Sequence, residues 1–220
     1  MDQAIRPSRG RAGIMLIVGV LLGLPVGWLL ASLAILPFQL GLFFFLLLGL
    51  LIGAFMYRAG RPAAPMARPL LWTTGMAVAL AIWLTSLLVE YNNAITRDAP
   101  KAVRDSMRRT SLTTEQVQEL RQGTTQAFSA TLKENYAPGG FVGYVRWAAT
   151  SGEVQLPKVV RSSTTTYQLK QRPISWIIRV VLSLLFMSGA ILSQVLGLSQ
   201  VSPVPDPATE DQNRPAPPVS

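Results

Sequence analysis

The chain has 220 residues, of which 50% are hydrophobic and only 14% are charged, and its formal net charge is +9. Soluble domains carry about 25% charged residues, so this composition favours a membrane protein. Cysteine and histidine are both absent, which excludes disulfides, thiolate nucleophiles, imidazole acid–base catalysis and the zinc sites built from these ligands.

The first apolar stretch runs from Ile14 to Tyr57 without a charged residue. A spanning helix needs about 20 apolar residues, so this stretch is too long for one helix and long enough for two. Pro37 favours the break, because a proline disfavours helical geometry in the residue before it. We therefore predict a helical hairpin with helices at 14–36 and 38–57. A signal peptide is the alternative for the first helix, but the apolar run exceeds the length of a signal core, and we favour a retained helix.

Two further apolar stretches predict a third and a fourth spanning helix. The third closes at Glu90, and the fourth carries Arg179 one turn inside its start, where arginine can reach the headgroups. The fold class that we predict is an all-α membrane protein with four transmembrane helices and a small, mostly helical extramembrane domain that includes one candidate β-hairpin. In chain order the predicted segments are a basic arm (1–13), the hairpin (14–57), a short basic loop (58–69), helix 3 (70–90), the extramembrane domain (91–172), helix 4 (173–198) and a disordered proline-rich tail (199–220).

Local signals predict helices in the first part of the extramembrane domain. Asp98 is expected to cap a short helix that runs to about Arg109, with Pro100 tolerated in its first turn. Thr113 and Gln116 have the spacing of a capping box, which predicts the start of a longer amphipathic helix.

The second part of this domain opens with a break at Pro138-Gly139-Gly140. Aromatic and apolar residues then recur at helical spacing from Phe141 onward. The stretch 154–170 is rich in valine and threonine and predicts a hairpin that turns near Ser162-Ser163.

Basic residues in short loops predict the orientation of the chain in the membrane. The arm and the loop at 58–69 lie on the same side, and both favour the cytoplasm. Basic residues inside 91–172 that lie close to the bilayer oppose this assignment, but long translocated regions respond weakly to charge. We expect a cell-membrane protein with both termini in the cytoplasm and 91–172 outside. The basic residues of the arm and loop are Arg6, Arg9, Arg11, Arg58, Arg61 and Arg68.

Small residues recur at four-residue or eight-residue spacing on three of the predicted spans, which places them on one face of each helix. Such faces let helices approach closely in lipid. We expect them either to pack the bundle, with the first hairpin closing on itself, or to mediate self-association. The residues are Gly19, Gly23, Gly27 and Ala31 in the first helix, Gly41, Gly49 and Gly53 in the second, and Gly189, Ser193 and Gly197 in the fourth.

Five residues are candidates for contacts with a partner or an ion. Glu90 and Arg179 are ionisable groups near the ends of spans, and they either pair with each other or form an ion site. Tyr144, Arg146 and Trp147 belong to a cluster of glycine and aromatic residues. The cluster is either a partner-binding surface or, as we favour, a set of aromatic residues that forms the core of the small domain or rests on the lipid interface.

No combination of serine, lysine and carboxylate meets the geometric requirements of an active site. We therefore assign no catalytic, cofactor or metal residue, and we lean against an enzyme. Our first hypothesis is a non-catalytic subunit or scaffold of a membrane assembly, with the bilayer and other membrane subunits or further copies of the chain as partners. We expect no nucleic-acid partner, since lipid headgroups account for the basic excess. The alternative is a small channel or transporter that uses the glycine-rich helices.

Overall fold

The computed structural model describes residues 9–32, 38–61, 66–106, 113–157, 164–169 and 172–200. Four of its helices are long and apolar enough to cross a membrane. Together with a helical segment and a small hairpin between the third and fourth of them, they confirm the predicted fold class. The four helices are α1 (Arg9–Ser32), α2 (Phe38–Gly60), α3 (Arg68–Asn93) and α7 (Pro173–Val195), and α7 continues into the short 3₁₀ turn η4 (Leu196–Ser199).

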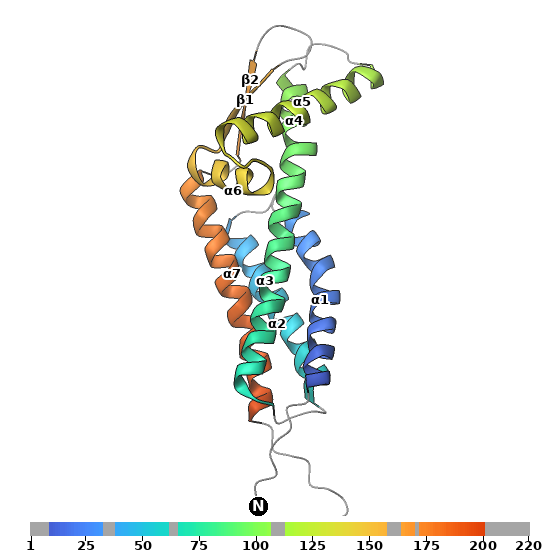
Figure 1. The fold of residues 1–220 in the computed structure, drawn as a ribbon, viewed down its shortest axis with the longest axis vertical. Coiled ribbons are helices and arrows are strands. Elements are labelled where there is room, and N and C mark those ends of the chain that lie inside the picture. Colours follow the sequence, from blue (N-terminus) through green and yellow to red (C-terminus); the bar gives the residue numbers. More distant parts are fainter. Residues whose placement is uncertain are drawn as a thin grey trace, which may run out of the picture.

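The four spans form an elongated bundle with the module between α3 and α7 at one end (Figure 1). The start of α1 and the end of α7 lie at the opposite end. α1 has its most extensive contact with α3, and α2 has its most extensive contact with α7. α1 and α2 also touch, but less extensively. The two helices of the hairpin therefore each pack mainly against a different helix, and not mainly against each other.

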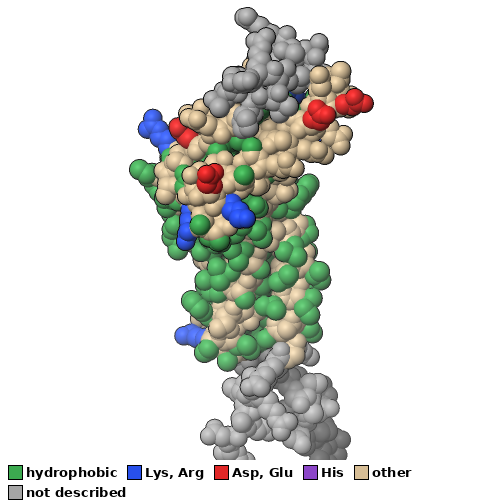
Figure 2. Space-filling view, turned by 45° about the horizontal axis from the view of Figure 1, so that its top comes forward, with side chains coloured by type: hydrophobic (Ala, Val, Ile, Leu, Met, Phe, Trp, Pro, Cys, Tyr) green, Lys and Arg blue, Asp and Glu red, His purple; other side chains and the backbone are tan. Residues whose placement is uncertain are grey.

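The interior of the bundle is filled by apolar side chains from all four helices, among them Met15, Ile52, Ile82 and Met187. The faces of these helices that point away from the interior expose many large hydrophobic residues, and Figure 2 shows hydrophobic side chains spread over the outside of the bundle. Lipid tails solvate such faces as well as another helix does. The bundle is thus apolar both inside and outside, as a membrane requires.

The third span continues beyond Glu90 instead of ending there. A π-helical segment, η3 (Ala94–Asp98), connects α3 to α4 (Ala99–Ser106). The prediction that Asp98 caps a separate helix is wrong, because Ala99 has helical backbone angles and its N–H bonds to the carbonyl of Ala94. Pro100 gives the physical reason: proline has no N–H to donate and its ring displaces the carbonyl four residues back. One wider helical turn accommodates the proline. η3 and α4 therefore leave the bundle as an uninterrupted continuation of α3, and we call these two elements the stem.

The rest of the module begins with α5 (Thr114–Asn135), whose capping box is confirmed. The Thr113 hydroxyl accepts from the Gln116 N–H at 3.3 Å, and the Gln116 side chain accepts from the Thr113 N–H at 3.0 Å. The break before α6 (Gly140–Thr150) needs glycine, since Gly139 and Gly140 have φ angles of 80° and 58°.

The predicted hairpin is present as β1 (Glu153–Pro157) and β2 (Thr164–Gln168), which pair antiparallel with Gln155 opposite Thr166. Its predicted turn at Ser162-Ser163 lies outside the described residues. The connection at 33–37 and the predicted tail from residue 201 onward also lie outside them. We call α4, α5, α6 and the hairpin together the extramembrane module.

Candidate functional site

The two charged residues near the ends of the spans meet in the structure. Nη2 of Arg179 on α7 lies 2.7 Å from each carboxylate oxygen of Glu90 on α3. The side chains are 15% and 16% exposed, respectively, so the ion pair is mostly shielded from water. Removing charges from water costs several kcal/mol per ion, and the cost is offset only when the remaining hydrogen-bonding capacity is used.

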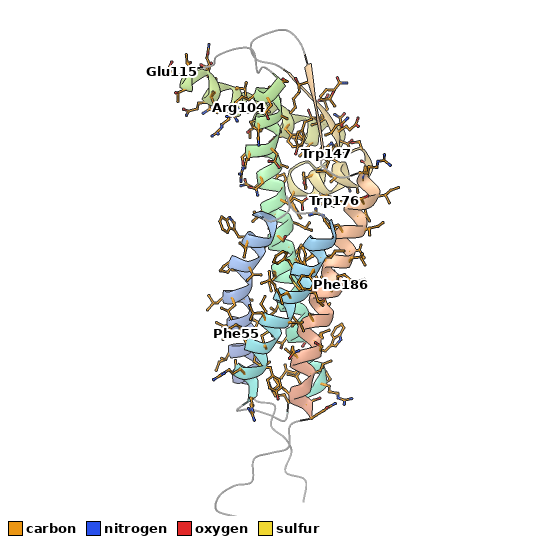
Figure 3. All side chains as sticks on the ribbon, turned by 180° about the vertical axis from the view of Figure 1, so that it is seen from behind. Phe55, Arg104, Glu115, Trp147, Trp176 and Phe186 are labelled. Carbon is orange, nitrogen blue, oxygen red and sulfur yellow. The ribbon has the colours of Figure 1, made fainter. Side chains whose placement is uncertain are left out.

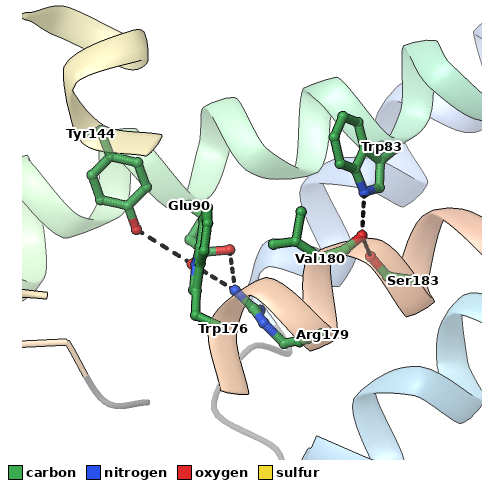
Figure 4. Close-up of polar contacts among 7 residues, drawn as sticks. All are labelled: Trp83, Glu90, Tyr144, Trp176, Arg179, Val180 and Ser183. Carbon is green, nitrogen blue, oxygen red and sulfur yellow. Dashed lines mark hydrogen bonds and ion pairs between the residues drawn. The ribbon is translucent and has the colours of Figure 1, made fainter. Parts of the chain in front are cut away.

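Two neutral donors use that capacity. The indole Nε1 of Trp176 donates to Oε1 of Glu90 at 2.9 Å, and the phenol of Tyr144 donates to the same oxygen at 3.3 Å (Figure 4). Trp176 lies three residues before Arg179 and hence on the same face of α7. One carboxylate thereby joins α3, α7 and α6, and we call these four residues the Glu90 cluster.

The protonation of Tyr144 suits its role as a donor. Burial raises the pKa of its phenol, and the negative charge of Glu90 raises that pKa further. The phenol therefore keeps its proton at physiological pH and presents it to the carboxylate. A neutral donor at this place stabilises the charge on Glu90 without adding a second charge that would have to be buried.

A small cavity lies beside the Glu90 cluster and is lined in part by Ser86 and Ser183. Its volume is about 10 Å³, which is about the space that a single water molecule needs. Nε of Arg179 is buried there without a hydrogen-bond partner among the described residues. Close by, Trp83 donates to the carbonyl of Val180 at 3.0 Å and adds a further hydrogen bond between α3 and α7. The cavity is too small for a solute.

The cluster of aromatic residues predicted as either a surface or a core is the core of the module. Trp147 and Tyr144 have no exposed surface, and the Trp147 ring packs edge-on against Phe128 at 5.1 Å and stacks on Tyr167 at 6.0 Å. Neither side chain is available to a partner. Arg146 is exposed and donates to the carbonyl of Ala137. Figure 3 shows Trp147 inside the module and Trp176 at its junction with the bundle.

The predicted small-residue faces have different surroundings. An added Cβ at Gly23 would meet the side chain of Ile82 on α3, and one at Gly49 would lie 2.8 Å from Cβ of Ala190 on α7. Gly19 and Gly27 also face α3, and Gly53 faces Gln194 and Ile191 on α7. In contrast, no described atom lies within 4 Å of such a Cβ at Gly189. Gly197 faces Tyr57 at a looser 3.4 Å, and the Ser193 hydroxyl bonds to its own helix at the carbonyl of Ala190.

Sequence reasoning placed Glu90, Arg179 and Tyr144 among the candidates but missed Trp176. Its spacing of three residues from Arg179 is the signal that would have identified it.

Of the predicted small residues, Ala31 and Gly41 have surroundings that lie outside what the structure describes. Among the described residues, no group of three or more acidic side chains is placed to hold a metal ion.

Comparisons with protein-family models, curated proteins and solved structures find no match to this chain.

Proposed function

We propose that this multi-pass membrane protein is a non-catalytic subunit or scaffold of a membrane assembly, which holds a rigid module at the membrane surface. The observation that carries the proposal is the Glu90 cluster. Its donors come from α6 and α7, so one carboxylate on α3 holds both the module, through Tyr144, and the last span, through Trp176 and Arg179. Such a connection keeps the module in one orientation relative to the membrane, which is what a docking platform needs.

The competing hypothesis is a small channel or transporter. Intramembrane charges that serve transport face a water-filled cavity and remain available to the substrate. Here Glu90 and Arg179 are bonded to each other, and the adjoining cavity admits at most one water. The glycines of α1 and α2 face side chains and backbone of α3 and α7. These observations favour helix packing as the role of Gly19, Gly23, Gly27, Gly49 and Gly53.

Gentle solubilisation followed by a mass measurement tests the assembly proposal. We expect the full chain, purified from its native membrane in mild detergent, to run with a mass above that of one chain. Native mass spectrometry then separates self-association from association with other subunits. A monomer that co-purifies with nothing would contradict the proposal. Flux of ions or small solutes into vesicles that contain only this chain would favour the competing hypothesis.

We also propose that both termini face the cytoplasm and that the module faces outward. The short loop carries Arg58, Arg61 and Arg68, and the end of α2 and the start of α3, which it connects, lie at the end of the bundle away from the module (Figure 1). Short basic loops remain in the cytoplasm far more often than they cross.

Single cysteines report the orientation cleanly, because the chain has no cysteine of its own. Ala67 and Ala130 are both exposed, the first beside the short loop and the second on α5. We expect an impermeant maleimide to label Ala130→Cys in intact cells and to label Ala67→Cys only after the membrane is permeabilised. The reverse pattern would show that the orientation is inverted.

A further inference from the structure

A groove on the extramembrane module concentrates positive charge. It lies in the corner between α5 and the stem formed by η3 and α4, and its volume is about 250 Å³. Arg97, Lys101 and Arg104 line it from the stem, and Arg121 lines it from α5. Residues at 97, 101 and 104 share one helix face. The continuous π-helical connection therefore brings all three to the same side.

Asp98 and Asp105 lie on the same stem as three of these cations, but neither lines the groove. The lining itself contains no acidic residue, and the ion pair described above between Glu90 and Arg179 does not involve it. Burial raises the pKa of the Tyr167 phenol in β2, and the charge of Asp98 raises that pKa further. Asp98 therefore lies close enough to the hairpin to affect it.

The rest of the lining makes this corner suitable for an anion. Pro100 and Leu120 are buried and form an apolar floor beneath the exposed basic side chains. Charges of one sign beside a low-dielectric wall focus the field and concentrate counter-ions. Arginine offers paired N–H groups that match the oxygens of a phosphate.

We infer that this groove binds a phosphate group. The volume is below that of a pocket for a drug-sized ligand, which suits a compact anion. Arg97 lies seven residues beyond Glu90, about 10 Å along the helix, and the headgroup layer extends roughly 6 Å beyond the hydrocarbon. These lengths place Arg97 near the lipid headgroups and Arg104 farther out along the stem, and Figure 3 shows Arg104 at the end of the molecule away from the spans. The phosphate comes either from a lipid headgroup or from a soluble compound.

A fluorescent reporter in the full-length protein tests the inference and separates the two sources. Gln118 is exposed beside the groove, and Gln118→Cys provides the single labelling site. In the first arm, detergent-solubilised protein is titrated with pyrophosphate at constant ionic strength. In the second arm, nanodiscs of phosphatidylcholine alone are compared with nanodiscs that also contain phosphatidic acid.

Two double variants with the same net charge provide the comparison. Arg104→Gln/Arg121→Gln removes two groove cations, and Lys133→Gln/Arg172→Gln removes two exposed cations elsewhere. We expect saturable binding to weaken about tenfold or more in the first variant and to change less than twofold in the second. Circular dichroism and melting curves verify that both variants are folded.

Each outcome decides the inference. A saturable response to pyrophosphate that the groove variant loses supports a soluble phosphate ligand. A response only to phosphatidic acid, again lost in the groove variant, supports a lipid headgroup. No saturable response in either arm, or a response that the groove variant retains, overturns the inference.

Discussion

Replacing Glu90 with glutamine is expected to lower the free energy of unfolding by about 3 kcal/mol. The variant keeps the shape of the side chain and its ability to accept a hydrogen bond, but it leaves the positive charge of Arg179 shielded and unpaired. Denaturant titration in mixed micelles measures the change. Because Tyr144 also donates to this carboxylate, hydrogen exchange should increase in α6 as the module loosens from the bundle.

Two comparisons separate the ion pair from the general effect of removing a carboxylate. Glu134→Gln, at an exposed position on α5, should change the free energy of unfolding by no more than about 0.5 kcal/mol. Glu90→Gln combined with Arg179→Gln leaves no unpaired charge and should be less destabilising than Glu90→Gln alone. If Glu90→Gln unfolds like the unmodified protein, the cluster does not stabilise the junction.

Replacing Gly49 with valine is expected to destabilise the bundle by about 2 to 3 kcal/mol. The first added carbon would lie 2.8 Å from Cβ of Ala190 and 3.0 Å from the carbonyl oxygen of Met187. A backbone atom cannot rotate away, so α2 and α7 must separate to make room. Titration in the same mixed micelles measures the loss.

Gly189→Val is the matched control for this prediction. The same substitution is made in the apolar part of α7, but no described atom lies within 4 Å of the added Cβ. We expect a change within about 0.5 kcal/mol, as for surface substitutions without a special environment. Equal losses at both positions would mean that valine itself, and not the contact between α2 and α7, causes the effect.

The function proposed here depends on rigidity at the junction between the module and the bundle. The Glu90 cluster and the continuous stem act at that junction, and the Trp83 bond joins α3 to α7 beside the cluster. A loose module would expose the cluster to water and screen the ion pair. The assembly measurement and the Glu90→Gln measurement therefore test two parts of the same idea, and they can fail separately.

Patterns within single segments were predictable from the sequence. The division of the apolar stretch from Ile14 to Tyr57 into two long helices follows from the number of residues that a bilayer accommodates. The capping box at Thr113 and Gln116 was correct because both partners lie within one helical turn. The stem was not predicted, since Asp98 and Pro100 resemble a helix start, and only the packing around them keeps the chain helical.

The sequence by itself determined that the chain has four helices long and apolar enough to cross a membrane and a small module before the last of them, because hydropathy and capping are properties of neighbouring residues. Only the tertiary structure decided which spans are adjacent, and which side chains meet. Tyr144 and Trp176 reach Glu90 across separations of 54 and 86 residues. Arg121 joins the cations of the stem in the same way. Contacts over such separations depend on how whole helices pack, and no local pattern encodes that packing.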